Sequence, residues 1–297
     1  MTDKGTILND SRVIPPPPNA RDLLAAAGLE PKKSWGQNFL REQDILRFIS
    51  QSVRAKEDEQ VVELGAGLGA LTYYLVQDYP RVIAVERDRD LIPVLEESFA
   101  WADNLTLQES DAAKLDYVSM AAECGRTLVV VGNLPYQISS RIMVSVAGAH
   151  QAVRRCIVMV QKEVAQRVVA GPGSKSYGLL SVLVQRTFSG TLTRVVPPGC
   201  FLPPPKVHSA VLSLERREVD RSPELDAALV SGARAAFSSR RKTLRNSVAG
   251  GLGARPNEVE DALNSVGIDP KRRAESLDLN EFELLGGALL TAGLLGD

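Results

Sequence analysis

The apolar run 128–131 is followed by Gly132 and then by Asn133, Leu134, Pro135 and Tyr136. An apolar strand would therefore end in an amide, a rigid ring and a phenol. The Asn133 side-chain oxygen and the Leu134 carbonyl are acceptors that could hold the N–H groups of an aromatic amine and draw its nitrogen toward a nucleophilic geometry. Pro135 would fix the turn, and Tyr136 would stack on the aromatic ring that carries the amine. The alternative is a satisfied turn with Tyr136 packed on the sheet edge.

Alkylation of such an amine needs no general base. The N–H proton becomes acidic once the nitrogen has been alkylated and is positively charged. This chemistry therefore suits a chain with only two histidines, His150 and His208, in which a histidine-based acid, nucleophile or metal cluster is nearly excluded. Three widely spaced cysteines fit neither a disulfide framework nor a zinc site, and we expect no metal.

A glycine-rich turn and two acidic residues indicate a nucleotide pocket. Gly65, Gly67 and Gly69 end one strand and open a helix, where backbone N–H groups meet anionic oxygens. Glu86 ends the next strand, 21 residues beyond Gly65, and is placed to accept both hydroxyls of a ribose. Asp111 ends the third strand and would accept from an adenine amino group or cap the following helix, and both interpretations stay open. The pattern predicts an adenosine-like cofactor.

Short β-branched runs alternate with helical stretches between residues 60 and 161, which is typical of a doubly wound parallel sheet. Two further runs, "TLTRVV" and "SAVLSLERR", are joined by a proline-rich loop and predict an antiparallel hairpin at the sheet edge. Beyond residue 220 only helical periodicity remains. We therefore predict an α/β fold with three segments: a disordered N-terminal arm over 1–18, a catalytic domain over 19–219, and a small all-helical domain over 220–297.

The formal net charge of −1 gives no global nucleic-acid signal. A local one exists, because residues 233–253 hold five basic and no acidic side chains; such a run is a solvated helix face or a phosphate-binding surface. The N-terminus lacks the basic and apolar segments of a signal peptide, and no apolar run reaches the ~20 residues that span a bilayer. We expect a cytoplasmic protein without membrane contact.

Seven blocks of the chain resemble, in the same order, those of the bacterial small-subunit ribosomal RNA adenine N6,N6-dimethyltransferases. The match spans residues 32–277 and consists of "KKSWGQNFL", "VVELGAGLGALT", "VIAVERD", "NLPYQIS", "MVQKEVAQRVVAGPGSKSYGLLSV", "FLPPPKVHSAV" and "FSSRRKTLRNS". The resemblance implies a Rossmann-like class I methyltransferase sheet, S-adenosyl-L-methionine as the donor, and transfer of two methyl groups to N6 of each of two adjacent adenosines near the 3′ end of the RNA.

Carried over by position, the resemblance implies a pocket for the donor and the target base, lined by Asn38, Leu40, Gly65, Gly67, Glu86, Asp111 and Asn133. Asn133 and Tyr136 would be catalytic in the sense given above, together with Leu134 and Pro135. Three positions depart from the family pattern, namely Trp35, Ser110 and His208. At these positions the resemblance does not define local packing or substrate contacts, whereas the residues of the chemistry match.

The resemblance also places the proline-stiffened loop with Phe201 beside the pocket, where the ring would sandwich the target base opposite Tyr136; the alternative is a core residue under the hairpin. A basic rim would contact phosphates of the immature small ribosomal subunit, through Lys32, Lys33, Arg240, Arg241, Lys242 and Arg245. The helix expected over 240–245 carries most of it. We expect a monomer.

Three other functions compete with this one. A related enzyme would methylate a large-subunit RNA adenine and confer antibiotic resistance, but the long helical tail disfavours it. A non-catalytic ribosome-assembly or transcription factor would keep the fold as a binding platform, and the intact Asn-Leu-Pro-Tyr segment favours activity instead. A nicotinamide dehydrogenase lacks an obvious group to move a proton with the hydride.

Overall fold

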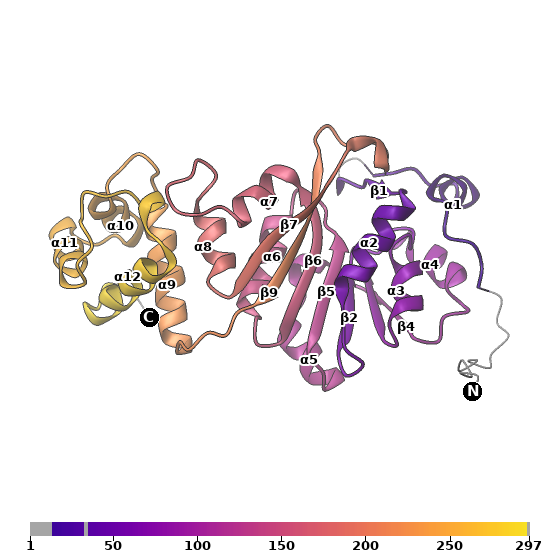
Figure 1. The fold of residues 1–297 in the computed structure, drawn as a ribbon, viewed down its shortest axis with the longest axis horizontal. Coiled ribbons are helices and arrows are strands. Elements are labelled where there is room, and N and C mark those ends of the chain that lie inside the picture. The colour runs from indigo at the N-terminus through magenta and orange to yellow at the C-terminus, as the bar shows by residue number, and fades with distance from the viewer. Residues whose placement is uncertain (1–13, 33–34, 296–297) are drawn as a thin grey trace, which may run out of the picture.

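The computed structural model describes residues 14–32 and 35–295, so most of the expected N-terminal arm and Lys33 lie outside the described residues. The chain forms an elongated molecule with a sheet-containing part (residues 19–216, the sheet part) and a group of helices at one end (residues 223–295, the helical part) (Figure 1). The predicted change from strands to helices therefore falls between Arg216 and Pro223.

One sheet of seven strands runs through the sheet part in the order β4-β3-β2-β5-β6-β9-β7. The first five strands in this order are parallel, whereas β9 is antiparallel to both of its neighbours, as the predicted edge hairpin requires. The strands are β2 (Gln60–Leu64), β3 (Val82–Glu86), β4 (Leu105–Glu109), β5 (Leu128–Asn133), β6 (Val153–Gln161), β7 (Phe188–Val196) and β9 (Ser209–Arg216).

Helices cover both faces of this sheet because its parallel strands are apolar on both sides. One core packs β2, β5 and β6 against α2, α3 and α4, and the other packs the opposite face against α5, α6, α7 and α8. These helices are α2 (Gln43–Val53), α3 (Thr72–Asp78), α4 (Ile92–Ser98), α5 (Tyr117–Cys124), α6 (Ser139–Gly148), α7 (Lys162–Val168) and α8 (Leu179–Gln185).

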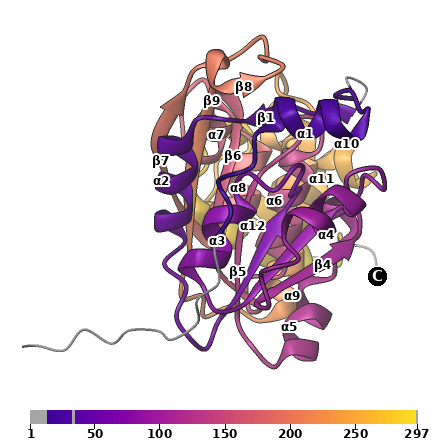
Figure 2. The same cartoon turned by 90° about the vertical axis from the view of Figure 1, so that its right-hand side faces the viewer.

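The segment before the sheet lies across the carboxyl ends of its strands. Helix α1 (Ala20–Ala27) is capped by the Asn19 side chain and ends at Gly28 in the left-handed conformation. Strand β1 (Phe39–Leu40) then pairs with β8 (Phe201–Leu202), and Figure 2 shows α1, β1 and β8 together above the sheet. Two parts of the chain about 160 residues apart are thus joined over one edge of the sheet.

The helical part consists of α9 (Pro223–Ala236), α10 (Leu244–Leu252), α11 (Pro256–Ser265) and α12 (Leu279–Thr291). Its apolar core also takes in Ala170, Tyr177 and Val182 from the sheet part, so the two parts share packing. The helix expected from Arg240 begins only at Leu244, because Thr243 has extended backbone angles and precedes the first helical residue. The division into separate domains stays a prediction.

The carboxyl ends of β2 and β5 approach each other closely at Gly132. A Cβ atom at this position would lie 2.4 Å from the Leu64 carbonyl oxygen, a distance that no real contact allows. Chain order reverses between these two strands, and ligands of open α/β sheets bind at such a point. The missing side chain therefore lets the loops after β2 and β5 meet at one site.

We expect Gly132→Ala to lower the free energy of unfolding by about 1–3 kcal/mol, because the added methyl group must push the two strands apart. Chemical denaturation measures the difference. The matched control is Gly148→Ala at the end of α6, where nothing lies within 4 Å of the added atom and alanine is the better helix former. Equal stability of the two variants would contradict the proposed close contact.

Candidate active site

A cavity of about 400 Å³ opens at the carboxyl ends of β2, β3, β4 and β5. Ten residues singled out in the sequence line it together: Asn38, Leu40, Gly65, Gly67, Glu86, Asp111, Asn133, Leu134, Pro135 and Tyr136. They come from four strand ends and from the segment around β1. The structure thus gathers residues from positions 38 to 136 into one pocket.

Asn133 is the last residue of β5, and its side chain has a fixed orientation. The Nδ2 group donates to the Asn38 carbonyl at 3.0 Å, so the amide oxygen remains available as an acceptor. Asn38 is itself held, because its own side chain donates to the Gly36 carbonyl at 2.9 Å. The next residue, Leu134, donates its N–H to the Met159 carbonyl at 3.0 Å, and its own carbonyl accepts no hydrogen bond from the described residues. Both residues line the cavity, so two acceptors without donors among the described residues belong to adjacent residues of its wall.

Tyr136 lines the same cavity, and its ring is anchored at the far end. Its hydroxyl lies 2.6 Å from Ser209 Oγ on β9, and its carbonyl accepts from Ser139 Oγ at 3.1 Å. Burial raises the pKa of the phenol, which therefore stays protonated and neutral. The turn is closed by the Ile138 N–H, which donates to the Pro135 carbonyl. The segment is thus a hydrogen-bonded turn in which the Leu134 carbonyl has no partner among the described residues, and Tyr136 also lines the pocket.

The Glu86 carboxylate joins the glycine loop to the end of β3. Its Oε2 accepts from the Gly67 N–H, and its Oε1 accepts from the N–H groups of Arg87 and Asp88, each at 2.8 Å. Burial raises the pKa of Glu86, against the opposing effect of these three donors. A carboxylate offers about four acceptor positions, so about one is left, on Oε2. Two ribose hydroxyls, as the sequence suggested, would have to displace the Gly67 N–H.

Asp111 fits both interpretations that the sequence left open. Its Oδ1 accepts from the Ala113 N–H at 3.0 Å and caps the short helix η2 (Ala112–Lys114). Its Oδ2 lies 3.9 Å from Arg87 Nη1, and the residue lines the cavity. One oxygen therefore serves the fold while the other faces the pocket region.

Glu63 is a pocket residue that the sequence reasoning missed. It lies within β2, its exposed fraction is 1%, and Thr72 Oγ1 donates to its Oε2 at 2.6 Å. Burial raises the pKa of this carboxyl to about 8, which keeps it protonated at neutral pH. The available signal was an acidic residue inside the apolar strand "QVVEL", where an unpaired charge is costly.

Trp35 and Arg87 also line the cavity and were not predicted to bind. The Arg87 guanidinium lies 4.3 Å from the centre of the Trp35 ring, and Lys32 Nζ lies 4.9 Å from it. Lys32 also pairs with Asp88 at 2.5 Å and with Asp90 at 2.7 Å. These contacts tie the segment before β1 to the loop after β3.

Phe201 does not line the cavity. Its exposed fraction is 1%, and its side chain packs in the core behind β1, where Phe201 pairs with Leu40. The structure thus places it as the core residue that the sequence allowed as an alternative. A stacking role would require the ring to leave this position.

The six residues of the expected basic rim have different environments. Lys32 is neutralised by its two acidic partners, Lys33 lies outside the described residues, and Arg245 pairs with Glu260 at 2.8 Å. Arg240 is exposed, but its guanidinium donates to the carbonyls of Lys175 and Tyr177. Arg241 and Lys242 are exposed and have no acidic partner within 4.0 Å among the described residues.

Parallel strands with a glycine loop after the first strand, an acid at the end of the second and Asn-Leu-Pro-Tyr after the fourth strand of the parallel series define a Rossmann-like class I methyltransferase. The family model of the ribosomal RNA adenine dimethylases matches residues 28–285. The chain belongs to this family, so it is an rRNA adenine dimethyltransferase that uses S-adenosyl-L-methionine.

Relatives agree with this assignment over nearly the whole chain. A protein named ribosomal RNA small subunit methyltransferase A from Anaeromyxobacter dehalogenans is 44% identical over 283 residues, which are 92% of this chain and 98% of the relative. The protein of that name from Lactiplantibacillus plantarum is 38% identical over 286 residues, which are 94% of this chain and 97% of the relative.

Two solved structures share the fold. A dimethyladenosine transferase from Plasmodium falciparum superposes with a TM-score of 0.72 at 24% identity, covering 86% of this chain and 98% of its own. The 23S rRNA methyltransferase ErmE superposes with a TM-score of 0.64 at 23% identity, covering 85% of this chain and 99% of its own. The fold alone therefore does not choose between ribosomal subunits.

We expect Glu63→Gln to flatten part of the pH dependence of stability. The folded pKa of about 8 exceeds the ordinary value of 4.5, so the folded state holds a proton that the unfolded state releases between these pH values. The stabilisation is complete below about pH 4.5 and is lost as the pH rises to about 8. Urea unfolding of both proteins at several pH values checks this: a constant difference between them would contradict it.

Proposed function

We propose that this enzyme dimethylates N6 of two adjacent adenosines near the 3′ end of small-subunit ribosomal RNA, acting as a cytoplasmic monomer on the immature subunit. The observation that carries the proposal is the geometry of Asn133 and Leu134. The Asn133 Nδ2 group donates to the Asn38 carbonyl, and neither the Asn133 amide oxygen nor the Leu134 carbonyl has a donor among the described residues. No helix among the described residues is long and apolar enough to cross a membrane.

The residues of the pocket fit S-adenosyl-L-methionine. The remaining acceptor position of Glu86 suits a ribose hydroxyl, and the Asp111 carboxylate suits an adenine amino group. Gly65 and Gly67 have positive φ angles of 74° and 61°, which glycine adopts readily. Because glycine has no side chain, the backbone here can also approach the ligand closely. When bound, the donor supplies a methyl group on a positively charged sulfur.

The target amine would be held by oxygen atoms rather than by an ionisable base. The Asn133 amide oxygen and the Leu134 carbonyl would each accept one N–H of the adenine, and Tyr136 would stack on its ring. Both acceptors are fixed by other hydrogen bonds, so they need no reorganisation when charge develops on the nitrogen. After the first methylation one N–H remains for one acceptor, which lets the same site carry the second transfer.

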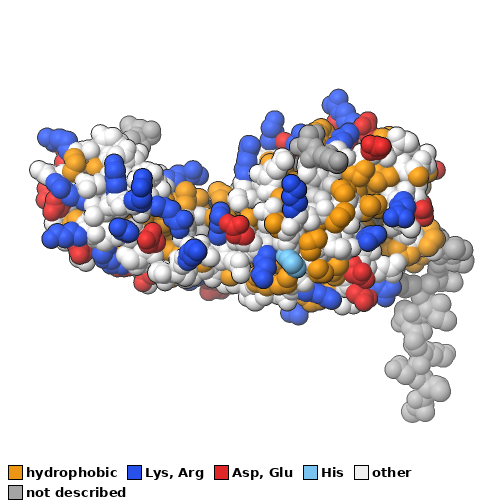
Figure 3. All heavy atoms as spheres, turned by 90° about the horizontal axis from the view of Figure 1, so that it is seen from above, with side chains coloured by type: hydrophobic (Ala, Val, Ile, Leu, Met, Phe, Trp, Pro, Cys, Tyr) orange, Lys and Arg blue, Asp and Glu red, His pale blue; other side chains and the backbone are white. Residues whose placement is uncertain are grey.

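The helical part would bind RNA through the exposed segment before α10. Figure 3 shows Lys and Arg side chains gathered over the helical part on the face where β1 and β8 lie. Arg241 and Lys242 are exposed cations of the helical part that have no acidic partner within 4.0 Å among the described residues, whereas the charge of Arg245 is balanced by Glu260. Unpaired cations release counterions from phosphates and contribute most to affinity. The small subunit is favoured by the names of the relatives.

We expect Asn133→Ala to slow methyl transfer by roughly 10²–10³-fold, because it removes one preorganised acceptor of the reacting amine. Single-turnover transfer of a labelled methyl group to immature small subunits measures the rate, and thermal unfolding confirms that the variant is folded. Mapping the modified nucleotide separates small-subunit from large-subunit activity. Near-normal turnover of the variant would show that Asn133 does not hold the amine.

We expect the double variant Arg241→Ala with Lys242→Ala to bind RNA more weakly and to reduce the slope of log affinity against log salt by about two. Affinity for S-adenosylhomocysteine should stay the same. The matched control is Lys56→Ala with Arg81→Ala, which removes the same charge at the amino ends of β2 and β3. Unchanged salt dependence in the first variant would refute the assignment of this surface.

A further inference from the structure

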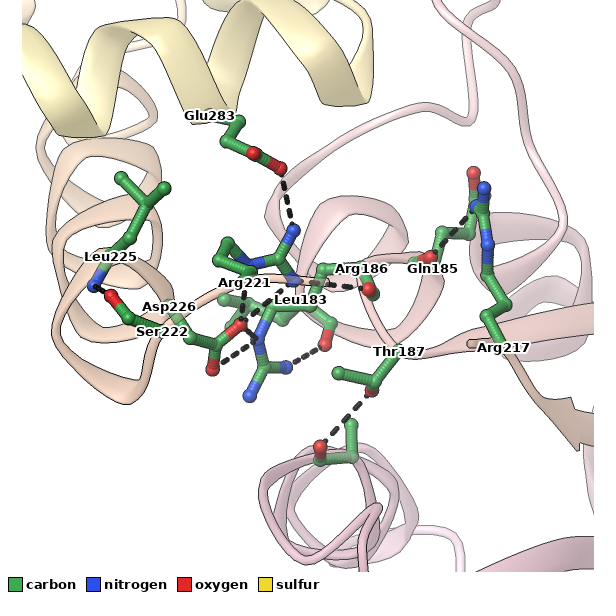
Figure 4. A network of polar contacts seen from close by, with 11 residues as sticks. Leu183, Gln185, Arg186, Thr187, Arg217, Arg221, Ser222, Leu225, Asp226 and Glu283 are labelled. Atoms are coloured by element: carbon green, nitrogen blue, oxygen red, sulfur yellow. Dashed lines mark hydrogen bonds and ion pairs between the residues drawn. The ribbon is translucent and has the colours of Figure 1, made fainter. Parts of the chain in front are cut away.

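A network of ion pairs, made by two buried arginines and two partly exposed acids, joins the sheet part to the helical part. Arg186 follows α8, Asp226 lies on α9, Glu283 lies on α12, and Arg221 precedes α9 (Figure 4). The Arg186 Nε group lies 3.2 Å from Asp226 Oδ1, and Arg221 Nη2 lies 2.9 Å from the same oxygen. Arg221 Nη1 reaches Glu283 at 2.7 Å. Both guanidinium groups therefore converge on one carboxylate, as Figure 4 shows.

The Arg186–Asp226 pair crosses the junction, whereas Arg221 belongs to the connecting segment and pairs with two acids of the helical part. Arg221 Nη2 also donates to the Arg186 carbonyl at 3.2 Å, so the connecting segment is bound to the end of α8. At the start of that segment the Arg217 N–H donates to the Thr187 carbonyl at 2.8 Å, and its guanidinium donates to the Gln185 carbonyl at 3.2 Å. The connection between the two parts is thus fixed at both of its ends.

A second set of contacts braces the junction elsewhere. The loop 171–178 extends from the sheet part, and its Tyr177 hydroxyl donates to the Leu277 carbonyl at 2.9 Å. The Gly173 N–H donates to the Glu275 carbonyl at 2.8 Å, and the Tyr177 ring packs edge-on against Phe237. The junction is therefore held at two separate places.

The side chains of Arg186 and Arg221 are only 5% and 6% exposed. Burying such groups contributes little net stability, because the lost hydration offsets the attraction between the charges. In some proteins buried charge pairs instead define one arrangement, since any other packing leaves a charge without its partner. A defined arrangement matters here, because the cavity and the unpaired cations Arg241 and Lys242 lie on different parts of the molecule.

We propose that Arg186, Arg221 and Asp226 are positioning residues, which fix the angle between the two parts so that RNA bound to the helical part presents its target adenosine to the cavity. This inference rests on the proposed function. It makes the junction a determinant of which adenosine is methylated. Misplacement of a bound substrate by about 1 Å can slow an enzyme about 10²-fold without weakening binding.

The test uses two variants of the full chain. Asp226→Asn removes the shared carboxylate, but it also lowers stability because it leaves buried guanidinium groups with one acidic partner fewer. The second variant combines Arg186→Met with Asp226→Leu; it removes the pair across the junction without an unpaired charge, and Arg221 keeps Glu283 and the Arg186 carbonyl. We expect this double variant to be as stable as the wild type.

Three quantities are measured for each variant: the single-turnover rate with immature small subunits, the Kd for those subunits, and the Kd for S-adenosylhomocysteine. We expect the rate to fall about 10–100-fold and both Kd values to change by less than about threefold. The methylated nucleotide is mapped as well, and loss of selectivity for the two adenosines is expected. The matched control is Arg154→Met with Glu59→Leu, a pair with similarly buried side chains inside the sheet part, which should leave the rate unchanged.

An unchanged rate in the double variant overturns the proposal. So does an equal loss of the methylation rate and of both binding affinities, or a loss of subunit binding alone. Small-angle X-ray scattering of the free proteins gives a readout independent of activity, since the double variant should sample more than one angle between its parts. If the wild type methylates no small-subunit adenosine, the proposed function fails. If the wild type and the double variant give identical scattering, the positioning role fails, whatever the outcome for the proposed function.

Discussion

The site depends on the close approach of two strand ends. Because Gly132 has no side chain, β5 comes against the Leu64 carbonyl, and the glycine loop after β2 meets the Asn-Leu-Pro-Tyr turn after β5. The Glu86 carboxylate then joins that loop to the end of β3 through the Gly67 N–H. The residues that would bind the methyl donor and those that would hold the target amine thus belong to one edge of the sheet.

Polar groups of the pocket are oriented by hydrogen bonds to their neighbours. The Asn38 carbonyl binds the donor side of the Asn133 amide, and Ser209 holds the Tyr136 hydroxyl. Thr72 donates to the protonated Glu63 at the floor of the cavity. The groups that would hold the target amine are therefore neutral, which is consistent with a chain that has only two histidines.

Much of the fold and of the pocket was predictable from sequence, because parallel strands bring their carboxyl ends to one edge whatever their exact lengths. That rule alone placed Gly65, Glu86 and Asn133 together. Side-chain pairing was not predictable, since it depends on which acids the fold brings near each cation. Lys32 illustrates this, because its partners lie more than fifty residues away and take it out of the expected basic rim. Packing was not predictable either, because the sequence left open whether the Phe201 ring lies beside the pocket or in the core, where the structure places it.

The pairing of β1 with β8 has a consequence for how the protein is made. Residues 39 and 40 emerge early during synthesis, but their strand partner at 201 and 202 emerges only after most of the chain has been translated. Until then the backbone that carries the Asn38 carbonyl lacks its neighbour across the sheet edge. A nascent chain that has not yet reached residues 201 and 202 therefore has the glycine loop but not a finished pocket.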